Sequence, residues 1–228
     1  MVLGVLFRES CPSCGGMSNA GFCSVCAADL PRTRDPCSGC GLARPVAHCP
    51  RKMAPWQVDN VVAPFAYAPP LDLHIQQMKY ANARSLGRAF GLLLAPAVRD
   101  ACNSVDALVA VPLHPARLRE RGYNQAIEIA RPLCRALGAP MLLWGIERRH
   151  ASPSQTRGNT AQRRASVASA FRIARNVAGL RIAIIDDVIT TGATVNAVAG
   201  ALRAAGAASC LAVAAARTPE AARQPRNR

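Results

Sequence analysis

The stretch RIAIIDDVITTGATV, residues 181–195, decides the fold that the sequence predicts. The apolar run over residues 180–185 indicates a buried strand, and the Ala-rich residues 193–205 indicate a helix that Gly206 ends. Two carboxylates and a Thr-Thr-Gly turn stand between these elements. In an open α/β sheet, ligands bind beyond the carboxyl ends of the strands. The turn is therefore a predicted ligand site.

The composition of the turn indicates a phosphate site. Gly192 permits a backbone conformation that is closed to other residues, and the threonines offer hydroxyl donors. Free backbone N–H groups at the start of the following helix point to the same place, together with the positive end of the helix dipole. The residues expected to form the ligand site after the acids are Val188, Thr190, Thr191, Gly192, Ala193 and Thr194.

The two acids before the turn, Asp186 and Asp187, need a separate explanation because carboxylates repel a phosphate. A carboxylate accepts strong hydrogen bonds from a sugar diol, and it also suits a Mg²⁺ ion that neutralises a diphosphate. Adjacent residues of a strand point to opposite faces, so the two acids need not share one role. The alternative, an Asp-Asp pair that only caps the helix, does not require the whole combination of strand, acids and turn. Both acids are the candidate catalytic residues.

The rest of the chain predicts an α/β protein. Strands are expected over 58–67, 106–112, 141–144 and 209–215, and helices over 71–80, 85–98 and 125–137. Strands that are apolar on both faces favour a mostly parallel sheet flanked by helices. Pro132 is expected to kink or divide its helix. The basic residues 147–166 are expected to form a loop that leads into a short helix.

The cysteines predict a metal module. Seven of the ten cysteines fall within residues 11–49, six of them in Cys-x-x-Cys pairs, and paired cysteines in an intracellular chain favour metal over disulfides. The first two pairs supply four thiolates for tetrahedral Zn²⁺. The third pair is followed by His48-Cys49, so its site either uses the histidine as fourth ligand or is incomplete. The candidate ligands are Cys11, Cys14, Cys23, Cys26, Cys37, Cys40, His48 and Cys49.

These patterns predict a cysteine-rich module over residues 1–52, an α/β domain over 53–217 and a basic, disordered tail over 218–228. The formal charge of +15 favours a polyanionic partner, either nucleic acid or a multiply phosphorylated ligand, although a biased genome composition also yields Arg-rich chains. Neither an apolar run of membrane-spanning length nor a secretory signal is recognised, so we expect a cytoplasmic protein without membrane insertion.

Two stretches resemble known families. The sequence IIDDVITTGAT, residues 184–194, resembles the motif with which type I phosphoribosyltransferases bind 5-phosphoribosyl-1-pyrophosphate (PRPP). The sequence VPLHPARLRERGYNQA, residues 111–126, resembles a block of the competence protein F (ComF) family, as do SPSQ at 152–155 and Phe171. In that family a cysteine-paired N-terminal module precedes a transferase-like domain. The resemblance runs from Cys11 to about Ala215.

The resemblance implies a type I phosphoribosyltransferase-like fold with a small N-terminal zinc-ribbon-like module, and PRPP with Mg²⁺ as ligand. It makes residues 111–121 the pyrophosphate loop and the basic residues 148–164 a mobile loop that closes over the site. Ser166 and Gly158 depart from the family pattern in or beside the second loop. The residues implied on the pyrophosphate side are Pro112, Arg121, Gly122, Asn124 and Gln125.

The family also implies a role in DNA uptake and natural transformation, and leaves turnover open. One hypothesis is a transferase in which a nitrogen nucleophile displaces pyrophosphate from PRPP, with an acceptor that the sequence does not identify. The second is a non-catalytic protein that reuses the fold to bind single-stranded DNA, against which the small number of aromatic residues argues. A third is a zinc ribbon that docks a partner protein, such as a component of the competence machinery.

Overall fold

The computed structural model of the chain describes residues 9–18, 21–53, 55–101, 105–142, 146–148 and 171–219. Within these residues, no helix has both the length and the apolar character needed to cross a membrane.

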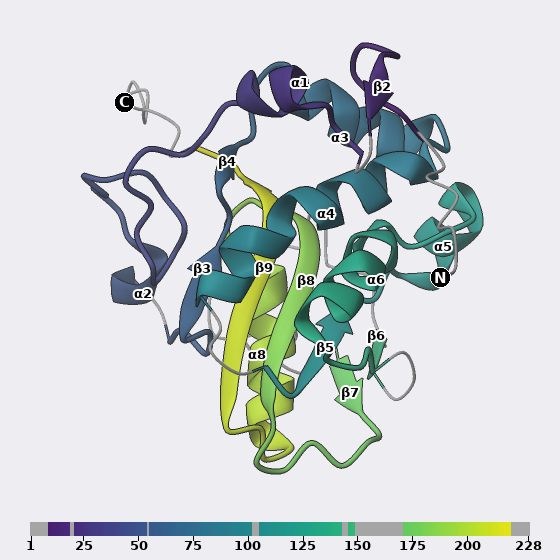
Figure 1. Ribbon diagram of the computed structural model, residues 1–228. Coiled ribbons are helices and arrows are strands. Elements are labelled where there is room, and N and C mark those ends of the chain that lie inside the picture. The colour runs from purple at the N-terminus through teal and green to yellow at the C-terminus, as the bar shows by residue number, and fades with distance from the viewer. Residues whose placement is uncertain are drawn as a thin grey trace, which may run out of the picture.

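A parallel sheet forms the centre of the fold (Figure 1). Its strands stand in the order β3 (Asn60–Val62), β9 (Ser209–Arg217), β8 (Arg181–Ile189) and β5 (Ala107–Ala110), and β4 (Phe65–Ala66) also pairs with β9. Every pairing among them is parallel, as the sequence predicts. β8 and β9 both extend beyond their predicted ends, so that both acids lie within β8.

Helices cover both faces of this sheet. α4 (Arg84–Ala101) and α6 (Gln125–Leu137) lie on one face, and α8 (Ala193–Ala204) lies on the other (Figure 1). Successive residues of β8 divide between two buried cores, because Ala183 and Ile185 pack with the first pair of helices while Ile182 and Ile184 pack with α8. This division explains why residues 182–185 are apolar at every position, and it confirms the flanked sheet.

Of the two outcomes expected at Pro132, a kink or a division of the helix, the division is wrong. α6 continues through this residue, although proline inside a helix costs about 3 kcal/mol. α4 approaches α6 closely at this point, since a Cβ atom added at Gly91 would lie 2.2 Å from the Pro132 ring and 2.3 Å from the Ile129 carbonyl oxygen. The buried surface between the two helices offsets the lost backbone hydrogen bond.

Two segments differ from their predicted structure. β6 (Ile146–Arg148) pairs antiparallel with β7 (Phe171–Ile173), so residues 147–148 belong to a strand rather than to a loop. α5 (Pro115–Arg121) is a helix within the predicted pyrophosphate loop, with Pro115 at its start and the left-handed Gly122 after its end. The predicted strand at 141–144 is a single parallel bridge at Met141 where it is described. Residues 149–170 and 220–228 lie outside the described residues.

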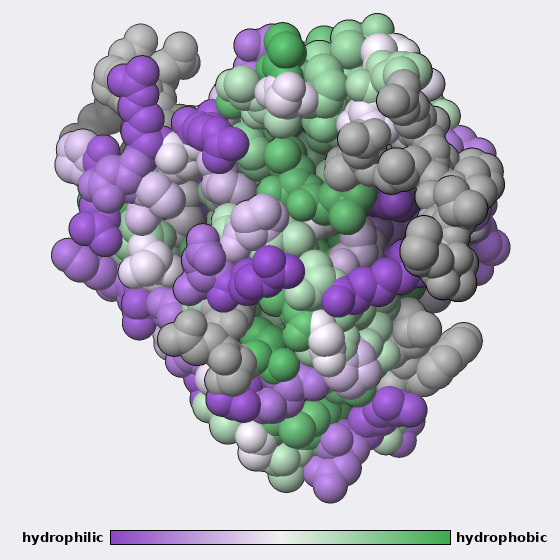
Figure 2. All heavy atoms as spheres, viewed as in Figure 1, coloured by the Kyte–Doolittle hydropathy of each residue, from purple (hydrophilic) through white to green (hydrophobic). Residues whose placement is uncertain are grey.

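The cysteine-rich N-terminal segment packs onto the main core. It contains β1 (Glu9–Ser10) and β2 (Met17–Ser18), which pair antiparallel, then α1 (Ser24–Ala28) and α2 (Pro50–Met53). Cys11, Phe22 and Leu30 are buried in the same core as α4, and the rings of Phe22 and Phe90 are 5.3 Å apart. Figure 2 shows apolar atoms gathered over α1 and α3 (Leu71–Tyr80), and mainly polar residues over the loop around α2.

One exposed ion pair predicts a pH-dependent stability. Asp106, just before β5, accepts hydrogen bonds from the Nε, Nη2 and backbone N–H of Arg181, and these bonds hold its pKa at about 2, below the ordinary 3.8. A lowered carboxyl pKa stabilises the fold above the unfolded-state pKa and loses this effect as the pH falls through the folded-state value. Asp106→Asn should therefore lower the melting temperature at pH 7, by a difference that shrinks between about pH 4 and pH 2. A constant difference in melting scans over that range would contradict this prediction.

Candidate functional site

The Thr-Thr-Gly turn, residues 190–192, joins the carboxyl end of β8 to the amino end of α8. Gly192 has a φ of 83° and stands directly before the helix, in the left-handed conformation that the sequence analysis expects a glycine to supply. Thr190 and Thr191 are exposed, and the Thr191 hydroxyl accepts a hydrogen bond from the Ala193 N–H at 3.3 Å. The turn thus presents hydroxyl groups and a helix amino end to solvent, which suits an anion.

The two acids are half-buried at the end of β8. The Asp186 carboxylate accepts a hydrogen bond from the Asp187 N–H at 2.9 Å. The Asp187 carboxylate lies 3.1 Å from the Lys79 ammonium, and both side chains are largely shielded from solvent. Lys79 lies outside every motif that predicted the site, and it adds a cation beside the predicted pair of acids.

The last turn of α3 joins the two halves of the predicted site. Lys79 pairs with Asp187 after β8, the Met78 carbonyl accepts a hydrogen bond from the Tyr123 hydroxyl, and the Arg121 guanidinium lies 5.3 Å from the centre of the Tyr80 ring. A backbone hydrogen bond also joins the two strands near their carboxyl ends, since the Val111 N–H donates to the Ile185 carbonyl at 2.8 Å. The ends of β5 and β8, and the residues that follow them, are therefore adjacent.

The RGYNQ block, residues 121–125, combines structural and free polar groups. Asn124 caps α6 through the Ala126 N–H and donates to the Val111 carbonyl at 2.9 Å, so it fixes the segment after β5. Gln125 is only 1% exposed, and its Oε1 accepts from Arg121 at 3.3 Å. Within the described residues, Gln125 Nε2 and Arg121 Nε are buried donors without a partner. Buried donors are normally paired, so these two indicate a place for an acceptor.

The other residues of the predicted pyrophosphate loop stand further out. Pro112 is half-buried two residues after the end of β5, where the chain leaves the sheet, and Gly122 follows α5 with a φ of 73°. Arg117 is exposed on α5 and pairs with Glu120 at 2.6 Å. Residues 149–164 of the predicted mobile loop, and SPSQ at 152–155 with them, fall outside the described residues.

Residues 55–58 form a strap across the start of α8. The Gln57 N–H donates to the Asn196 side chain at 2.6 Å, and the same side chain donates to the Pro55 carbonyl at 3.1 Å. The Trp56 ring lies against Gly192, where an added Cβ atom would come within 2.5 Å of it. Trp56 Nε1 is buried without a partner among the described residues. The strap therefore covers one side of the turn.

Arg217, the last residue of β9, reaches the other side of the turn. Its side chain donates to the Ile189 carbonyl at 2.8 Å, to the Thr190 carbonyl, and to the Cys40 carbonyl at 2.9 Å. Only 3% of the residue is exposed. The guanidinium therefore joins the end of β8 to the cysteine-rich segment.

The first cysteine cluster contains Cys11, Cys14, Cys23 and Cys26, whose sulfur atoms all lie within 4.8 Å of one another. Burial raises the pKa of the Cys11 thiol, but hydrogen bonds from backbone N–H groups, first that of Cys23, outweigh it and lower the pKa to about 6. Hydrogen bonds with Cys23 and Cys14 raise the pKa of Cys26 to about 12. Four thiol groups this close together suit a tetrahedral metal ion, which would displace their protons.

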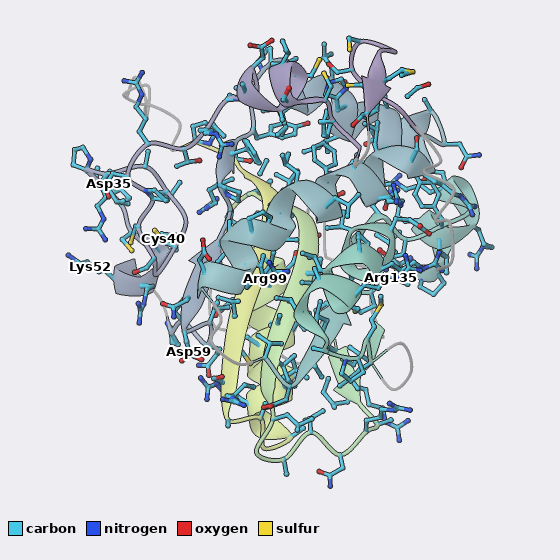
Figure 3. The ribbon with its side chains drawn as sticks, in the orientation of Figure 1. Asp35, Cys40, Lys52, Asp59, Arg99 and Arg135 are labelled. Carbon is cyan, nitrogen blue, oxygen red and sulfur yellow. The ribbon has the colours of Figure 1, made fainter. Side chains whose placement is uncertain are left out.

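The second cysteine cluster contains Cys37, Cys40 and Cys49, with sulfur atoms also within 4.8 Å of one another. The structure does not bring His48 into this group, so the neighbouring position in the sequence does not make it a fourth ligand here. A cavity of about 470 Å³ opens at the cluster and is lined in part by Asp35, Arg44 and Lys52. Figure 3 shows Asp35 and Cys40 in this loop and Lys52 in the neighbouring α2.

Comparisons with known proteins cover both the sheet and the site. The phosphoribosyl transferase domain family matches residues 124–227, a range that includes β8, the turn and β9. The chain is 34% identical over 203 residues to the DNA utilization protein YhgH of Salmonella typhi, covering 85% of this chain and 88% of the relative.

Two further relatives match over a similar length. The DNA utilization protein YhgH of Escherichia coli (strain K12) is 33% identical over 199 residues, covering 83% of this chain and 87% of the relative. The competence protein F of Haemophilus influenzae is 32% identical over 216 residues, covering 88% of this chain and 93% of the relative. Each match extends well beyond residues 124–227.

Proposed function

This chain belongs to the competence protein F family, and from that premise we propose that it binds PRPP at the carboxyl ends of β8 and β5, in the service of DNA uptake or use. The observation that carries the proposal is the convergence at the last turn of α3, which contacts both the acids of β8 and the RGYNQ block. A ligand with a phosphate, a diol and a diphosphate has one group for each part of this site.

The 5′-phosphate of PRPP would bind at the Thr-Thr-Gly turn. The contacts come from Val188, Thr190, Thr191, Gly192, Ala193 and Thr194, in which Thr190 and Thr191 are exposed and Thr194 is half-buried. The amino end of a 12-residue helix adds its dipole and free N–H groups. These donors match the oxygens of a single phosphate group.

The ribose would bind to Asp186 and Asp187. Ionised carboxylates accept the two hydroxyl protons of a diol, and a charge-assisted hydrogen bond is stronger than a neutral one. Lys79 lies 3.1 Å from Asp187, so the ion pair holds this acid in place. A bound Mg²⁺ would supply neutralisation of the diphosphate, and the carboxylate oxygens are ligands that suit this ion.

The diphosphate would bind beside the RGYNQ block. Arg121 Nε and Gln125 Nε2 are the buried donors that lack partners among the described residues, and phosphate oxygens are acceptors of the right kind. In a transferase, such donors stabilise the departing pyrophosphate when a nucleophile attacks the anomeric carbon. Asp186 and Asp187 would hold the ribose during that step, which makes them the candidate catalytic residues.

The experiment that tests this proposal is calorimetric titration of PRPP in the presence and absence of Mg²⁺. We expect saturable binding that is tighter with Mg²⁺, because the ion reduces the charge of the diphosphate. Ribose 5-phosphate, which keeps the phosphate and the diol, is the matched ligand and should bind more weakly. A protein that binds neither ligand would contradict the proposal.

We propose that the first cysteine cluster holds zinc, and the chain as purified should contain at least one equivalent. A second equivalent is expected only if His48 or another group completes the second cluster. Cys11 belongs to the first cluster and is also a buried core residue, so loss of the metal should lower the melting temperature. Metal analysis and melting scans of Cys14→Ser, with Cys134→Ser as control, check this. An unchanged melting temperature in metal-free protein would contradict it.

A second candidate function is binding of single-stranded DNA. The charge of +15 favours it, as do relatives named DNA utilization proteins. If the contacts are made to phosphates, affinity should fall by about tenfold or more between roughly 50 and 200 mM salt and depend little on the base sequence. Fluorescence anisotropy of labelled oligonucleotides measures both. The absence of binding at low salt would remove this candidate.

A further inference from the structure

We propose that Arg217 is a positioning residue that ties the second cysteine cluster to the Thr-Thr-Gly turn, so that metal held at this cluster sets the geometry of the phosphate site. The inference depends on the proposed function for the identity of the ligand. The link that Arg217 makes between the cluster and the turn consists of hydrogen bonds within the protein and does not depend on the ligand.

The contacts of Arg217 span the cluster and the turn. Nη1 of the guanidinium group donates to the carbonyls of Ile189 and Thr190, where β8 passes into the turn. Nε donates to the carbonyl of Cys40 at 2.9 Å. One rigid, planar group therefore connects the backbone of a cluster cysteine to the backbone of the turn.

The guanidinium of this arginine carries its charge in a buried position, since only 3% of the residue is exposed. No carboxylate forms an ion pair with Arg217 within the described residues. A buried charge needs a compensating partner. A divalent ion held by three thiolates retains a net negative charge, so the metal-loaded cluster supplies that partner.

The loop of the cluster is also built closely onto the sheet. The Val61 N–H of β3 donates to the Ser38 carbonyl at 2.6 Å. Gly41 has a φ of 74°, and a Cβ atom there would lie 2.8 Å from a methyl group of Val61 and 3.5 Å from Arg217 Cδ. The loop therefore has little room to move independently of Arg217. Loss of metal would release the Cys37 and Cys40 backbone and, through Arg217, the turn.

The first arm of the test replaces the tie itself. Arg217→Gln should weaken PRPP binding by about tenfold, because hydrogen bonds from a charged donor hold the turn. Arg217→Lys, which keeps the charge and loses the forked geometry, should fall between this variant and the unsubstituted protein. Arg99→Gln is the matched control, because Arg99 lies on α4, away from the turn (Figure 3). Its side chain donates a hydrogen bond of 3.0 Å to the Ala136 carbonyl. This control should leave the affinity within about twofold.

The second arm changes the cluster and reads the turn without any ligand. Trp56 lies against Gly192, so its fluorescence reports on the turn when the only other tryptophan is removed as Trp144→Phe. In that background, Cys49→Ser should shift the Trp56 emission and weaken PRPP binding. Cys134→Ser, outside both clusters, should change neither.

The outcomes separate this inference from the proposed function. If the unsubstituted protein does not bind PRPP, the proposed function fails, and the emission of Trp56 in Arg217→Gln and Cys49→Ser still decides the tie. Unchanged emission in both variants would overturn the inference, as would unchanged PRPP affinity in both. If Arg217→Gln does not fold, Arg217→Lys and Cys49→Ser give the decision on the same two measurements.

Discussion

Replacement of both acids, Asp186→Asn with Asp187→Asn, is expected to weaken PRPP binding by about tenfold or much more while the fold is retained. Each carboxylate would lose charge-assisted hydrogen bonds to the ligand, worth roughly 1.5–3 kcal/mol apiece. The substitutions conserve shape, and both side chains are half-buried at the end of β8 rather than inside either core. Calorimetric titration of the variant, accompanied by a thermal melt, measures both effects.

The single variants and a control sharpen this result. Asp187→Asn removes the partner of Lys79, so it should lower the melting temperature. Asp100→Asn, an exposed position on α4, is the control and should affect neither binding nor melting. Unchanged PRPP affinity in the double variant would mean that the ligand site is elsewhere and that the acids serve only the fold.

The sheet could be predicted from sequence because each of its main strands is a short apolar run with its own boundaries. The carboxyl end of β8 could not be predicted, because two acidic residues after an apolar run normally indicate that the strand has ended. In the structure Asp186 stays in register opposite Ala214 of β9, so its backbone remains in the sheet while its side chain is available to a ligand. A polar side chain at the end of a parallel strand does not interrupt the backbone pairing.

The turn and its acids could also be predicted from sequence, whereas the residues around them could not. Lys79, Trp56 and Arg217 reach the site through contacts between segments that are far apart in the chain. Weak signals exist for two of them, since the chain contains only two lysines against 26 arginines, and only two tryptophans. Arg217 has no comparable signal, because one arginine after an apolar strand is common at a surface.

The metal clusters show the same limit at shorter range. Cys-x-x-Cys spacing brings its two sulfur atoms together by local geometry, and the two pairs of the first cluster meet as expected. His48 has no such constraint, because the side chains of adjacent residues point in different directions. Of the pair His48 and Cys49, the structure places only Cys49 with Cys37 and Cys40. Spacing therefore predicts the pairs well and the remaining ligand poorly.

Gly192→Ala is expected to have the second large effect, lowering the free energy of unfolding by about 2 kcal/mol or more and weakening PRPP binding with it. Two causes add at this position. A φ of 83° is left-handed, which costs roughly 1–2 kcal/mol for a residue with a side chain. The new Cβ atom would also lie 2.5 Å from the Trp56 ring, so the strap and the turn would have to separate.

A double-mutant cycle with Trp56→Phe distinguishes the two causes. The smaller ring relieves the contact but leaves the backbone strain, so the double variant should be more stable than the sum of the single effects predicts, by about 1 kcal/mol. Urea unfolding of the four proteins measures this coupling, and PRPP titration shows whether binding recovers in parallel. Additive effects would mean that Trp56 does not press on the turn. A positive coupling with recovered binding would establish the strap as one wall of the phosphate site. Trp56→Phe relieves only the close contact between the ring at position 56 and the side chain added at position 192.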